Sequence, residues 1–186
     1  MVRRWPSFAI RNLRMKVSFR HGKPHLVLRE IVLAKSEDCD FDFTGWCFLG
    51  IAHGSGVCLC SGRSKLIEKD EVLVFHSECR VLIQASHLCG LTVQVFCLCP
   101  EILGSFLTTG EMHYIVTGAP QKCGFRVFPP RHPVAQSFRL IKEEGPCALP
   151  TPLFLLRCRM MGVVAEVFGV ETEQSLRLAE SDESTT

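Results

Sequence analysis

Short apolar runs follow one another along the chain from Lys16 to about Cys99. They include "MKVSF", "HLVLREIVLA", "WCFLGIAHG", "SGVCLC", "VLVFH", "CRVLIQAS" and "LTVQVFCLC". The runs recur at a spacing of roughly ten residues with Gly, Ser, Asp and Lys between them, a pattern typical of a β-sandwich or barrel. Several runs are apolar on both alternating faces, so we expect the sheet to be covered on both sides.

Turn signals predict how these strands connect. "MKVSF" and "HLVLREIVLA" flank "RHGKP" and are expected to form a hairpin. Gly54 and Gly56 predict a tight reversal between "WCFLGIAHG" and "SGVCLC". The segment "EKDE" is expected to be a polar turn before "VLVFH".

The periodicity changes after Pro100. The segment "EILGSFLTTGEMHYIV" mixes a short helix with a further strand, and "KCGFRVFPPRHP" is expected to be a connector because consecutive prolines discourage regular structure. A helix is expected to begin at Pro133 and to end at Gly145, since proline is tolerated in the first turn. Its apolar face is predicted to contain Val134, Phe138 and Ile141.

A second helix is predicted after Pro152. Apolar residues fall on it at alternating steps of three and four, the spacing of a helix–helix seam. They are Leu153, Leu156, Met160, Val163 and Val167. This stripe is a candidate dimer interface, and the alternative is that it packs onto its own β body, as most amphipathic helices do.

The length of 186 residues suits one domain, and 47% apolar with 22% charged residues suits a globular core. We divide it into a β-barrel at residues 1–125, a linker with two helices at 126–170, and an acidic, disordered tail at 171–186. Residues 1–35 carry nine Lys and Arg against Glu30, and the tail carries five acidic groups against Arg177. Both ends are interpreted mainly as solubilising.

The expected location is the cytoplasm. Arginines interrupt any apolar run near the start, and charged residues interrupt the apolar segment after Pro152, so neither a secretory signal nor a membrane span is predicted. Eleven cysteines, an odd number, do not describe a disulfide framework in a reducing compartment.

Two Cys-Leu-Cys triplets stand out, Cys58 with Cys60 and Cys97 with Cys99. Residues i and i+2 of a strand share a face, so four thiolates on neighbouring strands could hold zinc. However, the chain has no Cys-x2-Cys turn, and cysteine is among the most buried residue types. We therefore favour packing and predict no metal site.

The order of these features resembles the N-terminal regulatory half of AraC-family transcriptional regulators over residues 26–169. The resemblance rests on "GWCFLGIAHGSGVCLCSGRSKLIEKDEVLVFHS", "QASHLCGLTVQVFCLCPEIL" and "PPRHPVAQSFRLIKEEGPCALPTPLFLLRCRMMGVVAEVFG". It implies a mainly β fold, a cupin-like double-stranded β-helix (jelly-roll barrel) followed by two C-terminal α-helices. It also implies a small effector pocket, a homodimer and DNA binding. After Gly169 the remaining segment is too short and acidic for the family's paired helix-turn-helix, so DNA binding is expected only through a domain absent from this chain.

The function we predict is therefore non-enzymatic ligand sensing and dimerisation. Cupin enzymes hold metal with closely spaced histidines, and this chain has no His-x-His, so we assign no catalytic residue and no cofactor. The alternatives are a stand-alone cupin-like binding protein and a metal-dependent cupin enzyme. Polar anchors for an unknown small effector are sought on or beside the strands. The candidates are Trp46, His53, His76, Arg80 and Gln84.

Overall fold

The computed structural model describes residues 14–18, 25–104, 107–117, 124–143 and 153–183. It is mainly β, with helices after the strands. Among the described residues, nine strands join one sheet, in which β1 and β3 pair in parallel and the other neighbouring strands pair antiparallel. The strands are β1 (Arg14–Ser18), β2 (Arg29–Leu33), β3 (Asp38–Asp42), β4 (Trp46–Cys60), β5 (Arg63–Glu68), β6 (Val72–His76), β7 (Val81–Ala85), β8 (Leu91–Leu98) and β9 (Phe125–Phe128).

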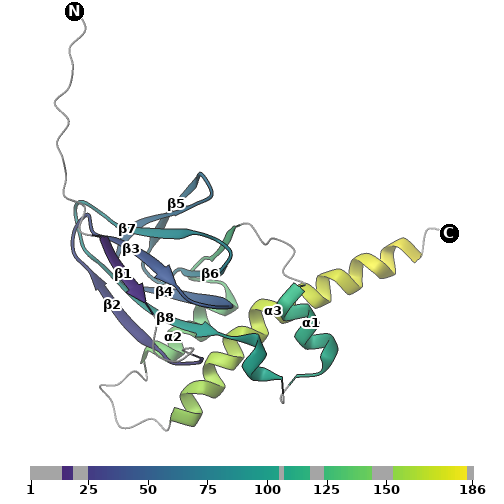
Figure 1. The fold of residues 1–186 in the computed structure, drawn as a ribbon. Coiled ribbons are helices and arrows are strands. Elements are labelled where there is room, and N and C mark those ends of the chain that lie inside the picture. Colours follow the sequence, from purple (N-terminus) through teal and green to yellow (C-terminus); the bar gives the residue numbers. More distant parts are fainter. Residues whose placement is uncertain (1–13, 19–24, 105–106, 118–123, 144–152, 184–186) are drawn as a thin grey trace, which may run out of the picture.

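The long strand β4 divides the sheet into two halves (Figure 1). Its first part pairs with β6 and β8, and these extend the half to β9 and β2. Its second part pairs with β5 and β7, and β7 continues to β3 and β1. We call the first set the helix-facing half and the second set the outer half.

Gly54 lies where β4 passes from one half to the other. Its φ is +84°, a conformation that favours glycine, and an added Cβ would meet the main-chain oxygen of Gly90. The predicted reversal at Gly54 and Gly56 is wrong, because the strand continues through both. The glycine signal marks a bend inside one strand.

A core fills the space between the two halves. Buried side chains alternate along each strand, so every second residue of β4, β6 and β8 enters this core. Alternate residues of β6, β8 and the first part of β4 form a second core with the helices: Trp46, Phe48, Val72, Val74, Phe96 and Leu98. The expectation of a sheet covered on both sides is therefore confirmed for the helix-facing half.

Helices follow the strands. They are a short 3-10 helix η1 (Pro100–Leu103), then α1 (Thr109–Thr117), α2 (Pro133–Glu143) and α3 (Leu153–Glu183). The predicted apolar face of α2 is confirmed, since Val134, Phe138 and Ile141 are all buried. The predicted connector contains strand β9, whose Phe125–Phe128 pairs with β6.

Three other predictions differ from the structure. The first two strands form no hairpin, because β1 pairs with β3 and β2 pairs with β8. The short helix expected after Pro100 is α1, and no strand accompanies it within residues 107–117. The acidic tail predicted to be disordered is helical to Glu183 as the end of α3. Residues 184–186 of that tail lie outside the described residues.

Aromatic rings join α2 to the sheet. Phe48 of β4 stacks on Phe96 of β8 with ring centroids 4.8 Å apart, and Phe96 stacks on Phe138 of α2 at 5.7 Å. Met160 and Val163 of α3 belong to the same core as these rings, so α2 and α3 pack on the same side of the sheet. Within the described residues, no helix is long and apolar enough to cross a membrane.

Candidate functional site

The five predicted ligand anchors do not converge on one pocket. Trp46 and His76 are register partners on β4 and β6, and their rings lie 5.0 Å apart. His53 and Arg80 are exposed. Gln84 lies in the outer half, where its Nε2 donates to Oδ1 of Asp38 at 2.8 Å. The expected effector position inside the barrel is occupied by packed apolar side chains.

A groove of about 430 Å³ lies between α1 and α3, and we call it the α1–α3 groove. Its volume falls in the range of small-molecule sites, about 300–1,000 Å³. One wall comes from the α1 segment, with Leu107, Gly110, Glu111, Tyr114 and Ile115. The other wall comes from α3, with Met161, Val164, Ala165, Phe168 and Gly169.

Trp46 connects the sheet to both walls of this groove. Its Nε1 donates to the main-chain oxygen of Ile115 at 3.0 Å, and its ring packs edge-on against Phe168 with centroids 5.2 Å apart. Trp46 is 7% exposed, so the hydrogen bond is shielded from water. The predicted anchor Trp46 therefore contacts both walls of the groove without lining it, and its ring also packs against His76.

The groove carries one acidic group. Thr108 and Glu111 form a capping box at the start of α1: the Glu111 carboxylate accepts from the Thr108 main-chain N–H at 2.8 Å and from its hydroxyl at 2.7 Å. These bonds from Thr108 lower the pKa of Glu111, because they stabilise the charged form. Glu111 is exposed, and among the described residues that line the groove it is the sole charged one.

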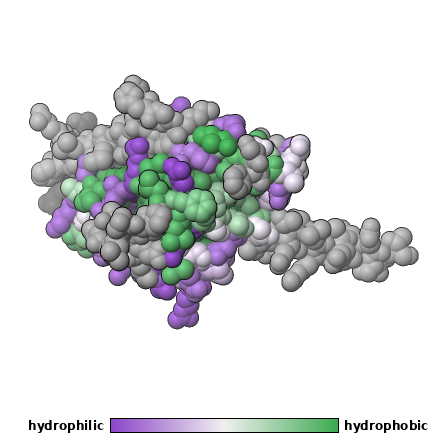
Figure 2. Space-filling model, turned by 90° about the horizontal axis from the view of Figure 1, so that it is seen from below, coloured by the Kyte–Doolittle hydropathy of each residue, from purple (hydrophilic) through white to green (hydrophobic). Residues whose placement is uncertain are grey.

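Figure 2 shows the molecule from below, turned by 90° from the view of Figure 1. Apolar residues gather across the middle of this face. Among the exposed large apolar side chains are Leu153, Phe154 and Leu155 at the start of α3, and Leu140 of α2. An exposed patch of this kind is typical of an interaction surface.

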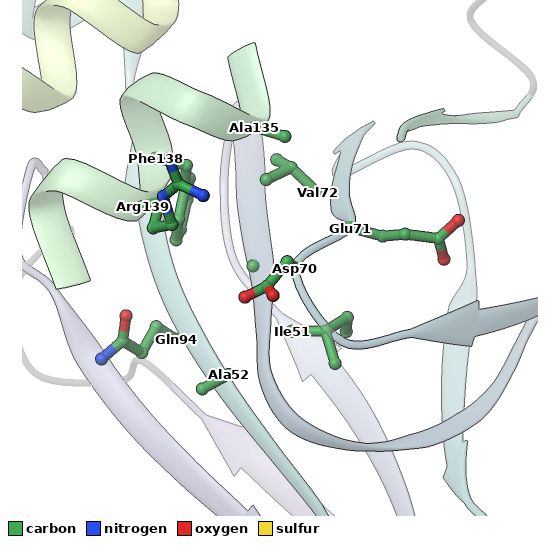
Figure 3. A pocket seen from close by; sticks show the side chains of 10 residues that line it. Ile51, Ala52, Asp70, Glu71, Val72, Gln94, Ala135, Phe138 and Arg139 are labelled. Atoms are coloured by element: carbon green, nitrogen blue, oxygen red, sulfur yellow. The ribbon is translucent and has the colours of Figure 1, made fainter. Parts of the chain in front are cut away.

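A second, smaller cleft lies where α2 crosses the helix-facing half. Figure 3 shows Phe138 and Arg139 of α2 above the strand that carries Gln94. Gln94 is 7% exposed, and the cleft has a volume of about 20 Å³. That is enough for a water molecule and too little for a small-molecule effector.

The Cys-Leu-Cys triplets are buried. Cys58, Cys60 and Cys97 belong to the core between the halves, and Cys99 donates its thiol to the main-chain oxygen of Thr44 at 3.4 Å. Burial raises the pKa of Cys58 to about 12, which keeps the thiol protonated at neutral pH. No group of three or more metal-ligating side chains occurs in the part of the chain that the structure describes.

The predicted dimer seam divides into two parts. Met160, Val163 and Val167 are 0–3% exposed and pack in the core beneath the sheet. Leu156 is half-buried against that core, and Leu153 is 71% exposed. Within one chain, the alternative of packing onto the chain's own body thus holds for the middle and end of the stripe.

Sequence reasoning missed the wall that α1 contributes. The only signals were the spacing Thr108-x-x-Glu111 of a capping box and the apolar residues after it. Neither identifies α3 as the opposite wall, because about fifty residues separate the two segments.

Comparisons with known proteins give a fold likeness at low identity. No family model matches the chain, and no curated protein matches it. The crystal structure of an apo ToxT variant from Vibrio cholerae is similar with a TM-score of 0.52 and 10% identity, covering 80% of this chain and 56% of ToxT.

Two further solved structures show the same coverage. ToxT from Vibrio cholerae bound to (E)-4-(8-methylnaphthalen-1-yl)but-3-enoic acid has a TM-score of 0.49 and 12% identity, covering 76% of this chain and 57% of ToxT. The AraC-like transcriptional activator CuxR has a TM-score of 0.47 and 8% identity, covering 75% of this chain and 52% of CuxR. The chain spans a little over half the length of these regulators.

Proposed function

We propose that this chain is a non-enzymatic, ligand-sensing domain of an AraC-like transcriptional regulator, with a cupin-like β body. The single observation that carries the proposal is the α1–α3 groove, an apolar concavity of ligand size. The fold likeness to ToxT supports the family. DNA binding would come from a domain outside this chain, because the chain spans about half of such regulators.

The mechanism follows from the two walls of the groove. A ligand in the groove would contact α1 and α3 together and would favour the arrangement of these helices that it fits best. Helix α3 continues from the groove to Glu183 (Figure 1), so its position is the natural output of binding. A DNA-binding domain attached to α3 would then respond to the ligand.

Homodimerisation belongs to the same proposal. The start of α3 supplies the surface, since Leu153 and Phe154 are 71% and 75% exposed. Sedimentation of wild type and Phe154→Gln tests it. We expect both proteins to form a dimer and the variant's dimer to be weaker, with a higher dissociation constant. A wild type that stays monomeric, or a dimer unaffected by the substitution, would contradict this interface.

The ligand site is tested with Nile red, a neutral apolar dye whose fluorescence rises in apolar surroundings. Ala165 is exposed and lines the groove, so Ala165→Trp would fill it. The matched control is Gly162→Trp on the same helix, because Gly162 lies outside the lining and an added Cβ meets nothing within 4 Å. Helical content by circular dichroism confirms that both variants fold.

We expect Nile red to bind wild type and the Gly162 variant equally and to lose most of its affinity for Ala165→Trp. Equal binding to all three proteins would place the dye elsewhere and would reject the groove as the ligand site. In the natural full-length protein, a ligand that displaces Nile red is expected to change the affinity for operator DNA. Unchanged DNA affinity with every displacing ligand would reject the regulatory role.

A further inference from the structure

The described lining of the α1–α3 groove carries negative charge and no positive charge. Of the ten described residues that line it, only Glu111 carries a charge, and six are apolar: Leu107, Ile115, Met161, Val164, Ala165 and Phe168. A ligand with an apolar body therefore finds contacts along both walls. A charged group on that ligand would lie near Glu111 without a basic residue in the lining to offset it.

Glu111 is held in place by its role at the start of α1. Its carboxylate accepts two hydrogen bonds from Thr108, and its own main-chain N–H donates back to the Thr108 hydroxyl at 3.2 Å. The reciprocal bonds hold the side chain at the start of α1, and the bonds from Thr108 lower the pKa of the carboxyl, so it is ionised at neutral pH. A carboxylate has acceptor sites left after two bonds, so it can still accept from a ligand.

Two basic residues of α3, Arg157 and Arg159, lie outside this site. Arg157 is near His25, where its charge and the burial of that ring lower the pKa of the histidine. Arg159 donates from Nη1 to the main-chain oxygen of Leu140 on α2 at 3.3 Å. Both precede Met161, the first α3 residue of the lining, and neither is in the lining itself.

We infer that the α1–α3 groove takes an apolar molecule that carries an amine cation, with Glu111 as the group that selects the charge. The inference rests on the proposed ligand site and adds the class of ligand. Opposite charges at an exposed rim attract modestly and like charges repel, so the sign of the head group decides between two ligands with the same apolar tail.

The experiment uses decylamine and decanoate at monomeric concentrations, each displacing Nile red from the groove. The two probes share their chain length, and their head groups are fully charged at neutral pH with opposite sign. Glu111→Gln removes the charge and keeps a side chain that can complete the capping box. Glu101→Gln is the matched control, because Glu101 is an exposed acid of η1 outside the lining.

We expect decylamine to displace the dye at about three- to ten-fold lower concentration than decanoate. The ratio corresponds to a modest attraction of the amine cation and a modest repulsion of the carboxylate by Glu111. The difference should disappear in Glu111→Gln and persist in Glu101→Gln. Equal or stronger displacement by decanoate, or a preference that survives Glu111→Gln, would overturn the inference. In those cases the groove still binds Nile red, so the proposed ligand site would stand.

Discussion

Replacing Gly50 of β4 with alanine is expected to lower the free energy of unfolding, although alanine usually stabilises a strand relative to glycine. An added Cβ would lie 2.6 Å from Cδ1 and 3.1 Å from Cζ of Phe138, and closer still to Cε1 of the same ring. Carbon atoms pack at about 3.5–4.0 Å, so the ring of Phe138 would have to move. Because this ring also stacks on Phe96, α2 would have to shift with it.

The magnitude is the difference between two effects. Overpacking a core costs about 1–3 kcal/mol, while alanine recovers about 0.5–1 kcal/mol of the entropic cost of glycine. The net expected loss is about 1–2 kcal/mol, measured by urea unfolding at equilibrium. Gly162→Ala on α3 is the control, since an added Cβ there meets nothing within 4 Å, and it should stabilise by about 0.5–1 kcal/mol.

A double-mutant cycle with Phe138→Leu tests the cause. If the ring is what Cβ meets, the loss caused by Gly50→Ala should shrink by at least about 0.5 kcal/mol in the Phe138→Leu background. A stabilising Gly50→Ala would refute the placement of α2 over this strand. Strict additivity of the two substitutions would refute it as well.

Three further outcomes are expected. Trp46→Phe should cost about 1–3 kcal/mol in urea unfolding, because it leaves a buried acceptor of α1 without its donor, and wild-type stability would contradict the hydrogen bond. Ser137→Ala should lower the free energy of unfolding by about 1–3 kcal/mol in urea. The Ser137 hydroxyl donates to Oε1 of Glu166 at 2.6 Å, and Oε2 of Glu166 is buried with no hydrogen-bond partner among the described residues. An unchanged free energy of unfolding would contradict this contact. The hydrogen bond with Ser55 lowers the pKa of Cys89. In Ser55→Ala, alkylation of Cys89 by iodoacetamide should therefore begin at higher pH, because the thiolate is the reactive form. An unchanged pH profile would show that Ser55 is not the cause of the lowered pKa.

The sequence predicts where the strands lie along the chain better than it predicts which strands pair with each other. Alternating apolar residues identify β7 and β8 and the covered faces of the sheet, because the side-chain period of a strand is local. The pairing of β1 with β3 and of β2 with β8 joins segments that no turn signal connects. At Gly54, a glycine indicates a special backbone angle and does not specify whether the strand reverses or bends.

The apolar stripe on α3 shows a second limit of prediction from sequence. A three- and four-residue spacing predicts that one face of a helix is buried, and it does not specify whether the partner is a second chain or the helix's own sheet. Met160 and Val163 pack beneath the sheet, whereas Leu153 extends past it. The candidate site is harder still, because its walls come from two segments that meet only in the folded chain.

One stretch of helix α3 packs in the core and also lines the proposed ligand site. Val164 is buried in the core beneath the sheet and also lines the α1–α3 groove, and Phe168 does the same while packing against Trp46. A ligand that presses on these side chains therefore acts on residues that fix α3 to the sheet. Because packed cores switch between discrete arrangements rather than deform smoothly, ligand binding in the groove would change how α3 is seated. This coupling requires no pocket between the two halves of the sheet, where apolar side chains already fill the space.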